Sequence, residues 1–394
     1  MNLNQLLECV KSRSVIRYSV DLSPASPDGL VCPPTYAASK RGEPPYIAFR
    51  RAFVDGQQRD IVVLDSPQSQ SNRVELALLA ASRAKRIAYP DIEIAFPAQT
   101  AEPVYSVLQL SHRIYDAVMR ACSADGKPFF DSEIGKSILA SRLSTATALF
   151  EHAPITLVLG AWDSNGGGGP LSAKIPRLLT SEIIGLDAQR ADISATKFDP
   201  MDIRSNVAEL VPTNDTVRRF EIKGKAGKDK GKKPSEFGFG SVPATAAPRA
   251  AVISGATQTS VLSCSGLRHI SFPTVDGEVD PARDQAGRAV LAALSLFGLV
   301  AQNESGYLLR SRCELLPRDG GKLEMIGRTL KEVEVTELHT DTACDLLAAA
   351  CKNAAAHGLK FRDTVMRLQA DDRLQELVRR SRDAAAQGDG SDEA

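Results

Sequence analysis

The sequence predicts a mixed fold of the α+β class, and three observations support this prediction. The runs Val15–Leu22 and Ile61–Asp65 have the apolar or alternating character of β-strands. The residues of Gln285–Gln302 are apolar at helical spacing over a length typical of a buried helix. The chain has 394 residues and is 43% hydrophobic, so it can bury one large core or two.

The composition argues against several classes of protein. The formal net charge is zero, which disfavours a protein that coats nucleic acid with its whole surface but leaves room for a local basic patch. Residues 1–8 lack the pattern of a signal peptide, and the apolar run Ala289–Ala301 is too short to cross a bilayer. The seven cysteines contain no CxxC pair and the five histidines do not cluster. We therefore expect a cytoplasmic protein with free thiols and with no metal or cofactor.

The first 151 residues are expected to alternate between strands and helices. A Pro-rich connection leads from the first strand to a second at Ile47–Val54, and the strand Ile61–Asp65 leads into a polar loop. The expected helices run from Arg73 to about Arg86 with Ser71 or Asn72 as N-cap, over a short stretch at 110–117, and from Glu133 to Glu151 after a cap at Asp131 or Ser132.

A glycine-rich segment at Asp163–Pro170 is the most informative part of the chain. The apolar run Ile155–Trp162 before it predicts a buried strand, and residues 171–185 after it predict a helix that ends at Gly185. A strand, four glycines and a helix that opens with Lys174 and Arg177 can bind a phosphate, because amides at a helix start point outward. A tight turn beside a solvated basic face explains this segment equally well.

The composition changes sharply after Val217. Residues 218–233 carry eight cations and two acids among glycines, and Phe237 and Phe239 follow them. We expect residues 212–245 to form a basic, flexible insertion that contacts the backbone and bases of single-stranded nucleic acid. A solvated lysine-rich loop is the alternative.

Regular structure is expected to resume after this insertion. The predicted elements are a strand at Thr259–Ser263, the helix Gln285–Gln302, a strand at Tyr307–Leu316 with Arg310 and Arg312 on a cationic face, and helices at Thr342–Ala356 and Phe361–Arg382. Residues 384–394 form a small acidic tail that we expect to be disordered. Residues 1–383 are then one core with insertions.

Motifs of common enzymes are missing from the sequence. It has no G-x-x-x-x-G-K-[ST], no G-x-S-x-G and no H-E-x-x-H, so the glycine loop is not a Walker A site. No sequence motif therefore supports an enzymatic function.

Six stretches in this order resemble one known family. They are residues 64–75, 111–117, 128–135, 148–151, 160–185 and 262–272. Together they resemble the backbone subunit of type I-G (formerly I-U) CRISPR effector complexes, in the RAMP superfamily. The similarity extends from about residue 60 to residue 316.

The resemblance implies a fold and a function. The fold would be a modified RNA-recognition-motif (ferredoxin-like) palm with finger-like and thumb-like insertions, the thumb candidate being residues 212–245. The function would be that of a structural, non-cutting subunit that polymerises head to tail along a guide crRNA and presents its bases to target DNA. Partners would be further copies, the large subunit and the RNA-processing subunit, with no membrane. Such a protein should contact the RNA backbone and not the base edges.

The polar and basic residues within these stretches are the candidate RNA contacts. They are Gln68, Ser69, Ser71, Asn72, Arg73, His112, Arg113, Gly166, Gly167, Lys174, Arg177, Arg218, Lys223, Lys225 and Arg268. Two structural alternatives remain open: an N-cap role for Ser71 or Asn72, and a buried ion pair of Arg113 with Asp116.

Two other functions remain compatible with the sequence. A metal-dependent nuclease of the same superfamily would cut RNA with an acid such as Asp131 or Asp163. A nucleotide-binding enzyme would use the Gly166–Gly169 loop.

Overall fold

The computed structural model describes most of the chain. The described residues are 1–38, 40, 43, 45–97, 102–163, 174–204, 206–213, 219–224 and 231–386, without the side chains of 195–197, 242–248 and 385–386.

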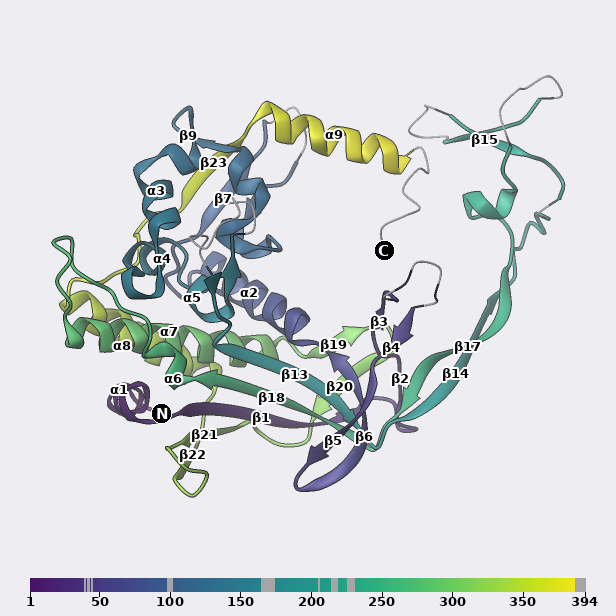
Figure 1. Ribbon diagram of the computed structural model, residues 1–394. Helices are drawn as coiled ribbons and strands as arrows, with labels where there is room; N and C mark the ends of the chain where they lie inside the picture. The colour runs from purple at the N-terminus through teal and green to yellow at the C-terminus, as the bar shows by residue number, and fades with distance from the viewer. Residues whose placement is uncertain are drawn as a thin grey trace.

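A curled antiparallel sheet forms the base of the molecule (Figure 1). Its strands follow the order β19-β20-β1-β18-β13-β6-β5, and the hairpin β21–β22 pairs with β1. The bounds are β1 Val15–Pro24, β5 Phe49–Val54, β6 Gln57–Asp65, β13 Leu179–Leu186, β18 Gly255–Ser263, β19 Tyr307–Arg310, β20 Cys313–Pro317, β21 Lys322–Ile326 and β22 Val333–Glu337. Every second residue of β1 and β13 is buried, so one face of the sheet points to the core.

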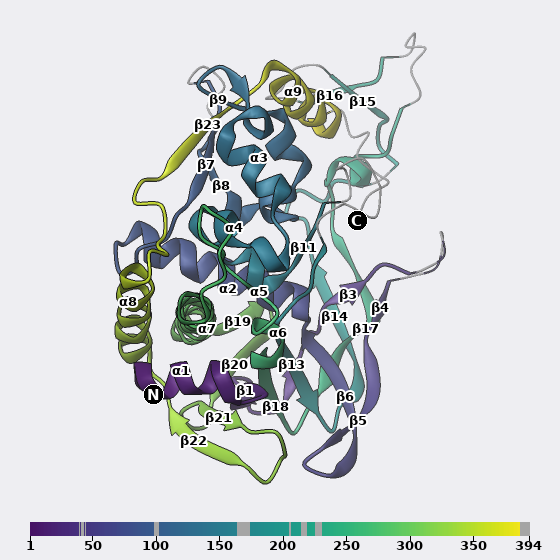
Figure 2. The same ribbon diagram turned by 60° about the vertical axis from the view of Figure 1, so that its left-hand side comes forward.

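Helices cover that face of the sheet. The central helix α7 packs against α1, α2 and α8, and α2 also packs against β13 (Figures 1 and 2). Their bounds are α1 Leu3–Ser12, α2 Pro67–Arg83, α7 Pro281–Glu304 and α8 Thr340–Ala356, and the short α6 spans Cys264–Leu267. Within the described residues, α7 alone has the length and hydropathy of a membrane span, but 89% of its apolar window is buried, as in a core helix.

A smaller sheet and several short helices stand above this layer (Figure 1). The smaller sheet has the order β10-β9-β23-β7-β8, in which β23 is parallel to β7. Its strands are β7 Ile92–Ala95, β8 Tyr105–Ser106, β9 Cys122–Ala124, β10 Lys127–Pro128 and β23 Met366–Ala370. Around them lie η2 Val107–Gln109, η3 Arg113–Tyr115, η4 Ala117–Ala121, η5 Phe129–Asp131, α3 Glu133–Ala140, η6 Leu143–Thr145, α4 Thr147–His152, α5 Thr156–Leu159 and α9 Asp372–Ala386.

A long hairpin, called the arm below, leaves the main sheet and curves upward on the right of Figure 1, to the level of α9. Its stem is β14 Gln189–Lys197 paired with β17 Val242–Val252, and β2 Leu30–Val31 joins β17 at the base. The distal part holds β15 Leu210–Pro212, β16 Phe220–Ile222 and η7 Pro234–Phe237. Two more short pairs complete the fold: β3 Thr35–Tyr36 with β4 Tyr46–Ile47, and β11 Ala161–Trp162 with β12 Lys174–Ile175.

The mixed fold and several elements agree with the sequence predictions. The strands at Val15–Leu22, Ile61–Asp65 and Thr259–Ser263 are present, as are the helices at Gln285–Gln302 and Thr342–Ala356. Ser132 caps α3 as one of its two candidate N-caps.

The prediction around the glycine segment was wrong on both sides. Within Ile155–Trp162, residues Thr156–Leu159 form the helix α5 and only Ala161–Trp162 form a strand, β11. In place of the helix predicted at 171–185, the described residues form β12 and β13. Gly185 does not end a helix: it lies within β13, where a Cβ atom would be 2.8 Å from the Ile253 Cγ2. The spacing of the apolar residues is compatible with two structures: a helix, or a bend followed by an alternating strand. These residues are Ile175, Leu178, Leu179 and Ile183. The strand forms because alternate residues of Leu179–Leu186 are buried on one face of the sheet.

Three further elements differ in their boundaries. The helix expected at Glu133–Glu151 is broken into α3, η6 and α4. The strand expected at Tyr307–Leu316 is the hairpin β19–β20, with Arg312 at the turn with φ of +57°, so Arg310 and Arg312 share no strand face. The helix expected at Phe361–Arg382 is the strand β23 followed by α9.

Candidate nucleic-acid interface

The polar run at residues 66–73 belongs to the first turns of α2 and is not a loop. Ser66 is the N-cap, since its hydroxyl accepts from the Ser69 amide at 3.3 Å, and Pro67 stands in the first turn. The predicted caps Ser71 and Asn72 are therefore wrong. Proline cannot continue a strand ladder but is well suited to the first turn of a helix, which explains why α2 begins there.

Helical geometry divides the predicted contacts of this run into two groups. Gln68 and Asn72 are four residues apart and both are exposed on one face of α2, whereas Ser69 is half-buried. Ser71 is buried, and its hydroxyl donates to the Pro67 carbonyl at 2.8 Å. Gln68 and Asn72 can thus meet a ligand, and Ser71 cannot.

Arg73 holds the fold together at the same place. Its Nε donates to the buried Asp65 Oδ2 at 2.9 Å and its Nη2 donates to the Leu309 carbonyl at 2.9 Å. Arg310 from β19 approaches the other oxygen of Asp65 at 3.5 Å. Two guanidinium groups share one carboxylate, so the start of α2 keeps one excess positive charge.

Two tyrosines that sequence reasoning missed lie beside this charge. The β3–β4 pair brings the rings of Tyr36 and Tyr46 to 5.8 Å, and Tyr46 is exposed. Burial raises the pKa of the Tyr36 phenol. A hydrogen bond with the Ser66 hydroxyl and the charge of the Arg310 guanidinium act in the opposite direction, because both groups lie close to the phenol. Both tyrosines lie in or next to the Pro-rich connection, which the sequence predicts only as a link between two strands. Their aromatic side chains are the sequence feature that could have indicated a contact with bases.

We call the residues gathered here the α2 patch. They are Tyr36, Tyr46, Ser66, Gln68, Asn72, Arg73 and Arg310. The patch combines an exposed aromatic ring, amide and hydroxyl groups and an excess cation, which are the groups that stack on bases and bind phosphate or 2′-hydroxyl oxygens.

A buried hydrogen-bond network supports the patch from below. Gln70 is its centre: its Nε2 donates to Asp65 Oδ2 at 2.6 Å, and its Oε1 accepts from Ser181, Gln258 and Gln302 at 2.8, 2.9 and 3.0 Å. These partners come from β6, β13, β18 and α7. The network therefore fixes α2 to both the sheet and the central helix.

Arg113 is buried and paired with Glu75, and its contact with RNA stays a prediction. Its Nε and Nη2 donate to the two oxygens of Glu75 at 2.6 and 3.1 Å, and its Nη1 donates to the Gly160 carbonyl at 3.0 Å. The structural alternative from the sequence, a buried ion pair of Arg113 with Asp116, is wrong. The Asp116 side chain caps η4 instead and accepts from the His112 amide. His112 itself is exposed.

Arg177 lies close to the buried pair of Arg113 and Glu75. Its Nε donates to the Leu159 carbonyl at 3.2 Å, and burial lowers its pKa, as does the neighbouring Arg113. Burial raises the pKa of Glu75 to about 7 in spite of the two arginines. Arg177 thus holds the chain that follows the glycine segment and is only partly available to a ligand.

The glycine segment itself lies largely outside the described residues, including Gly166 and Gly167. On its two sides, Trp162 pairs with Lys174, whose Nζ is 5.4 Å from the ring centre, and both residues are exposed. Asp163 is buried and accepts from Arg120 at 2.7 and 3.0 Å. The first described element after the segment is the strand β12 and not a helix, so the described residues form no phosphate site at helical amides there. Lys174 beside Trp162 stays a predicted contact.

The arm contains only part of the predicted basic insertion within the described residues. Arg218 and Lys225 lie outside them, and the Lys223 Nζ contacts the Glu209 carboxylate at 2.7 Å. Phe237 and Phe239, expected to stack on bases, pack on Phe220 at 5.9 and 4.9 Å. This aromatic cluster therefore holds the distal part of the arm together.

Arg268 is a structural residue too. Its Nη1 donates to the carbonyls of Val10 and Arg13 at 3.0 and 2.7 Å, so it closes the C-terminal end of α1. Arg268 is half-buried, and its contact with RNA stays a prediction.

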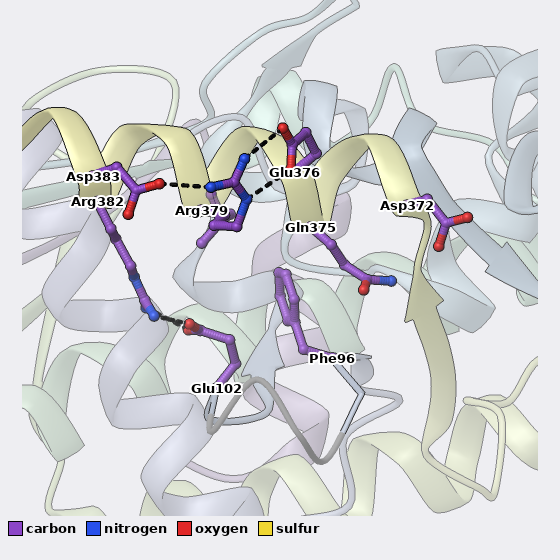
Figure 3. A pocket seen from close by; sticks show the side chains of 9 residues that line it. Phe96, Glu102, Asp372, Gln375, Glu376, Arg379, Arg382 and Asp383 are labelled. Atoms are coloured by element: carbon purple, nitrogen blue, oxygen red, sulfur yellow. Dashed lines mark hydrogen bonds and ion pairs between the residues drawn. The ribbon is translucent and has the colours of Figure 1, made fainter.

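A hollow of about 430 Å³ lies beneath α9, away from the predicted residues (Figure 3). Arg379 lies between Glu376 and Asp383, and Arg382 contacts Glu102. Hydrogen bonds from Arg379 and from Arg380 lower the pKa of Glu376 to about 2. With Asp372, four acids line this hollow against two cations, so it disfavours phosphate. Within the described residues, no group of three or more potential metal ligands is found.

Comparisons with known proteins point to one class. Residues 16–190, just under half of the chain, match the model of the family described as CRISPR-associated protein GSU0053. This part of the chain is thus similar to a family of CRISPR-associated proteins. The crystal structure of Csc2 from Thermofilum pendens matches over 97% of this chain and 80% of that chain, with 10% sequence identity. Its TM-score is 0.29, which does not show that the two folds are the same. No curated protein matches the chain.

Proposed function

We propose that this protein is a guide-RNA-binding backbone subunit of a type I CRISPR effector complex, of the I-G subtype. The observation that carries the proposal is the match of residues 16–190 to a family of CRISPR-associated proteins. That stretch contains most of the α2 patch, whose groups suit an RNA backbone and a stacked base. The subunit would be structural and without catalytic activity, would act in the cytoplasm, and would need no cofactor.

The partners in this proposal are the guide crRNA, target DNA through the guide, further copies joined head to tail, and the large and RNA-processing subunits. The main curled sheet would be the modified RRM-like palm and the arm the thumb-like insertion. Guide sequences vary, so amides, hydroxyls and cations that contact backbone atoms suit the task better than groups that recognise one base.

The experiment is to purify the protein from cells that express a CRISPR array and to sequence the RNA that remains bound. We expect discrete guide-length RNA in ladder-like assemblies, with retention that falls steeply as the salt concentration rises. RNA of no defined length at low salt only, or none even with the partner subunits present, would contradict the proposal.

Matched variants locate the contact on the protein. Gln68→Ala combined with Asn72→Ala should reduce retained RNA several-fold for unrelated guides, because it removes two exposed amides and no internal hydrogen bond. Ser71→Ala, on the buried face of the same helix, is the control and should leave RNA retention unchanged. Arg73→Ala is a poor test, because it also leaves the buried Asp65 with a weaker partner.

A further inference from the structure

Two buried thiols lie in contact beneath the N-terminal helix. Cys9 on α1 and Cys264 at the start of α6 are 255 positions apart, and their Sγ atoms are 4.0 Å apart. Their exposed fractions are 1% and 0%. A disulfide requires about 2 Å between the sulfur atoms, so the two thiols are in van der Waals contact but not bonded.

The backbones that carry these thiols are held together independently of the sulfur atoms. The amides of Cys264 and Ser265 both donate to the Ser14 carbonyl, at 3.0 and 3.2 Å. Arg268 on the α6 side binds the last carbonyls of α1, at Val10 and Arg13. α1 and α6 therefore keep the thiols in place whether or not the sulfur atoms are bonded.

The surroundings of the two thiols make them chemically unequal. The hydrogen bond from Cys9 and the charge of Arg268 lower the pKa of the Cys264 thiol, although burial opposes them. The same hydrogen bond and burial raise the pKa of the Cys9 thiol. Cys264 is thus the thiol that ionises first and reacts first with an electrophile.

We propose that Cys9 and Cys264 are a site of oxidative modification, at which hydrogen peroxide produces a disulfide that joins α1 to α6. The Cys264 thiolate attacks one peroxide oxygen, the O–O bond breaks, and the released hydroxide takes up a proton to form water. The Cys9 sulfur then attacks the Cys264 sulfenic acid. The S–S bond forms, the S–O bond breaks, and the leaving hydroxide combines with the Cys9 proton to form a second water. Two thiols lose two electrons, and one peroxide is reduced to two waters.

Peroxide reaches the pair when α1 opens. This helix has ten residues, and a helix of that length depends on its tertiary contacts, so its local opening costs less free energy than global unfolding. Larger oxidants are excluded by the packing of α1 against α7 and α6. The product closes a covalent loop through most of the chain, which restricts the unfolded state, so the cross-linked protein should unfold at a higher temperature.

The test uses the full chain, treated with hydrogen peroxide, unfolded, alkylated and digested without reductant. We expect a Cys9–Cys264 cross-linked peptide about 2 Da lighter than the sum of the two thiol peptides. Treated protein should also run faster in a non-reducing gel and unfold several degrees higher, and a thiol reductant should reverse both changes. Cys344 and Cys351 on α8 are less buried and report the extent of general oxidation.

Two variants and one control separate this pair from other thiols. Cys9→Ser and Cys264→Ser should each abolish the faster band and the rise in unfolding temperature, whereas Cys351→Ser should keep both. The wild-type peptide map decides the question even if either serine variant fails to fold. The proposal is overturned if Cys9 and Cys264 remain alkylatable at a peroxide dose that oxidises Cys344. It is also overturned if either thiol is found bonded to another cysteine.

Discussion

At the scale of single residues, most of the predicted cations bind the protein itself. Arg73, Arg113 and Arg268 each donate to a buried carboxylate or to backbone carbonyls. Arginine suits this role because its five donors can satisfy several acceptors at once. The sequence shows where these arginines are but not what they bind. The carboxylate or carbonyl that each arginine binds lies between 8 positions away, as Asp65 does from Arg73, and 258 positions away, as Val10 does from Arg268. A carbonyl partner leaves no signal in the sequence.

Glu75 provides a prediction about pH. Its pKa in the folded protein is about 7, raised from 4.5 by burial, so the folded state binds a proton more strongly than the unfolded state. This contribution to stability is complete below pH 4.5 and is lost as the pH rises through about 7. The shift corresponds to about 3 kcal/mol.

Thermal unfolding of the wild type and of Glu75→Gln between pH 5 and pH 8 measures this contribution. The wild type should lose stability relative to the variant as the pH rises, because only the wild type has a carboxyl group to ionise at this position. No change of the wild type relative to the variant over this range would mean that Arg113 holds the pKa of Glu75 at or below its ordinary value.

At the scale of elements, the sequence predicts a helix or strand correctly where its apolar residues have one dominant periodicity. The prediction fails where the apolar residues are compatible with both the helical and the strand periodicity. The helix α7 is apolar over many turns and has no alternative structure. In Leu179–Leu186 the alternation of buried and exposed residues is visible only once β6 and β18 are known to flank the strand. The patch on α2 was predicted in part, because Gln68 and Asn72 are in the sequence run, whereas their exposure follows from a helix start at Pro67.

Gly185 tests the assignment of β13. A Cβ atom there would lie 2.8 Å from Ile253 Cγ2 and 3.1 Å from Val62 Cγ1. Gly185→Ala should therefore lower the free energy of unfolding by roughly 1–3 kcal/mol through overpacking, measured by urea denaturation.

The double variant Gly185→Ala with Ile253→Ala serves as the control. Removing the isoleucine side chain makes room for the new methyl group, so the double variant should be more stable than the sum of the two single losses predicts. Additive losses would show that the two residues are not in contact.

At the scale of the whole molecule, the stem of the arm is the antiparallel ladder of β14 with β17, which β2 joins at its base. The outermost pair in this ladder is Lys197 with Val242, so the distal residues 198–241 can be replaced by an Asn-Gly turn without removing a strand of the main sheet. The shortened protein should unfold at the wild-type temperature and lose most of its guide RNA and its ladder-like assemblies. Wild-type RNA retention in the shortened protein would show that the arm is not the thumb-like element proposed above.

The order in which the strands leave the ribosome differs from their order in the two sheets. In the smaller sheet, the inner position between β7 and β9 is taken by β23, which ends at residue 370. In the main sheet, β18 lies between β1 and β13 although it is synthesised after both. Neither sheet can close during most of translation, and such long-range pairing slows folding. The strand edges of β7 and β9 are thus unpaired until β23 has been synthesised, and we expect a need for chaperones before assembly on RNA begins.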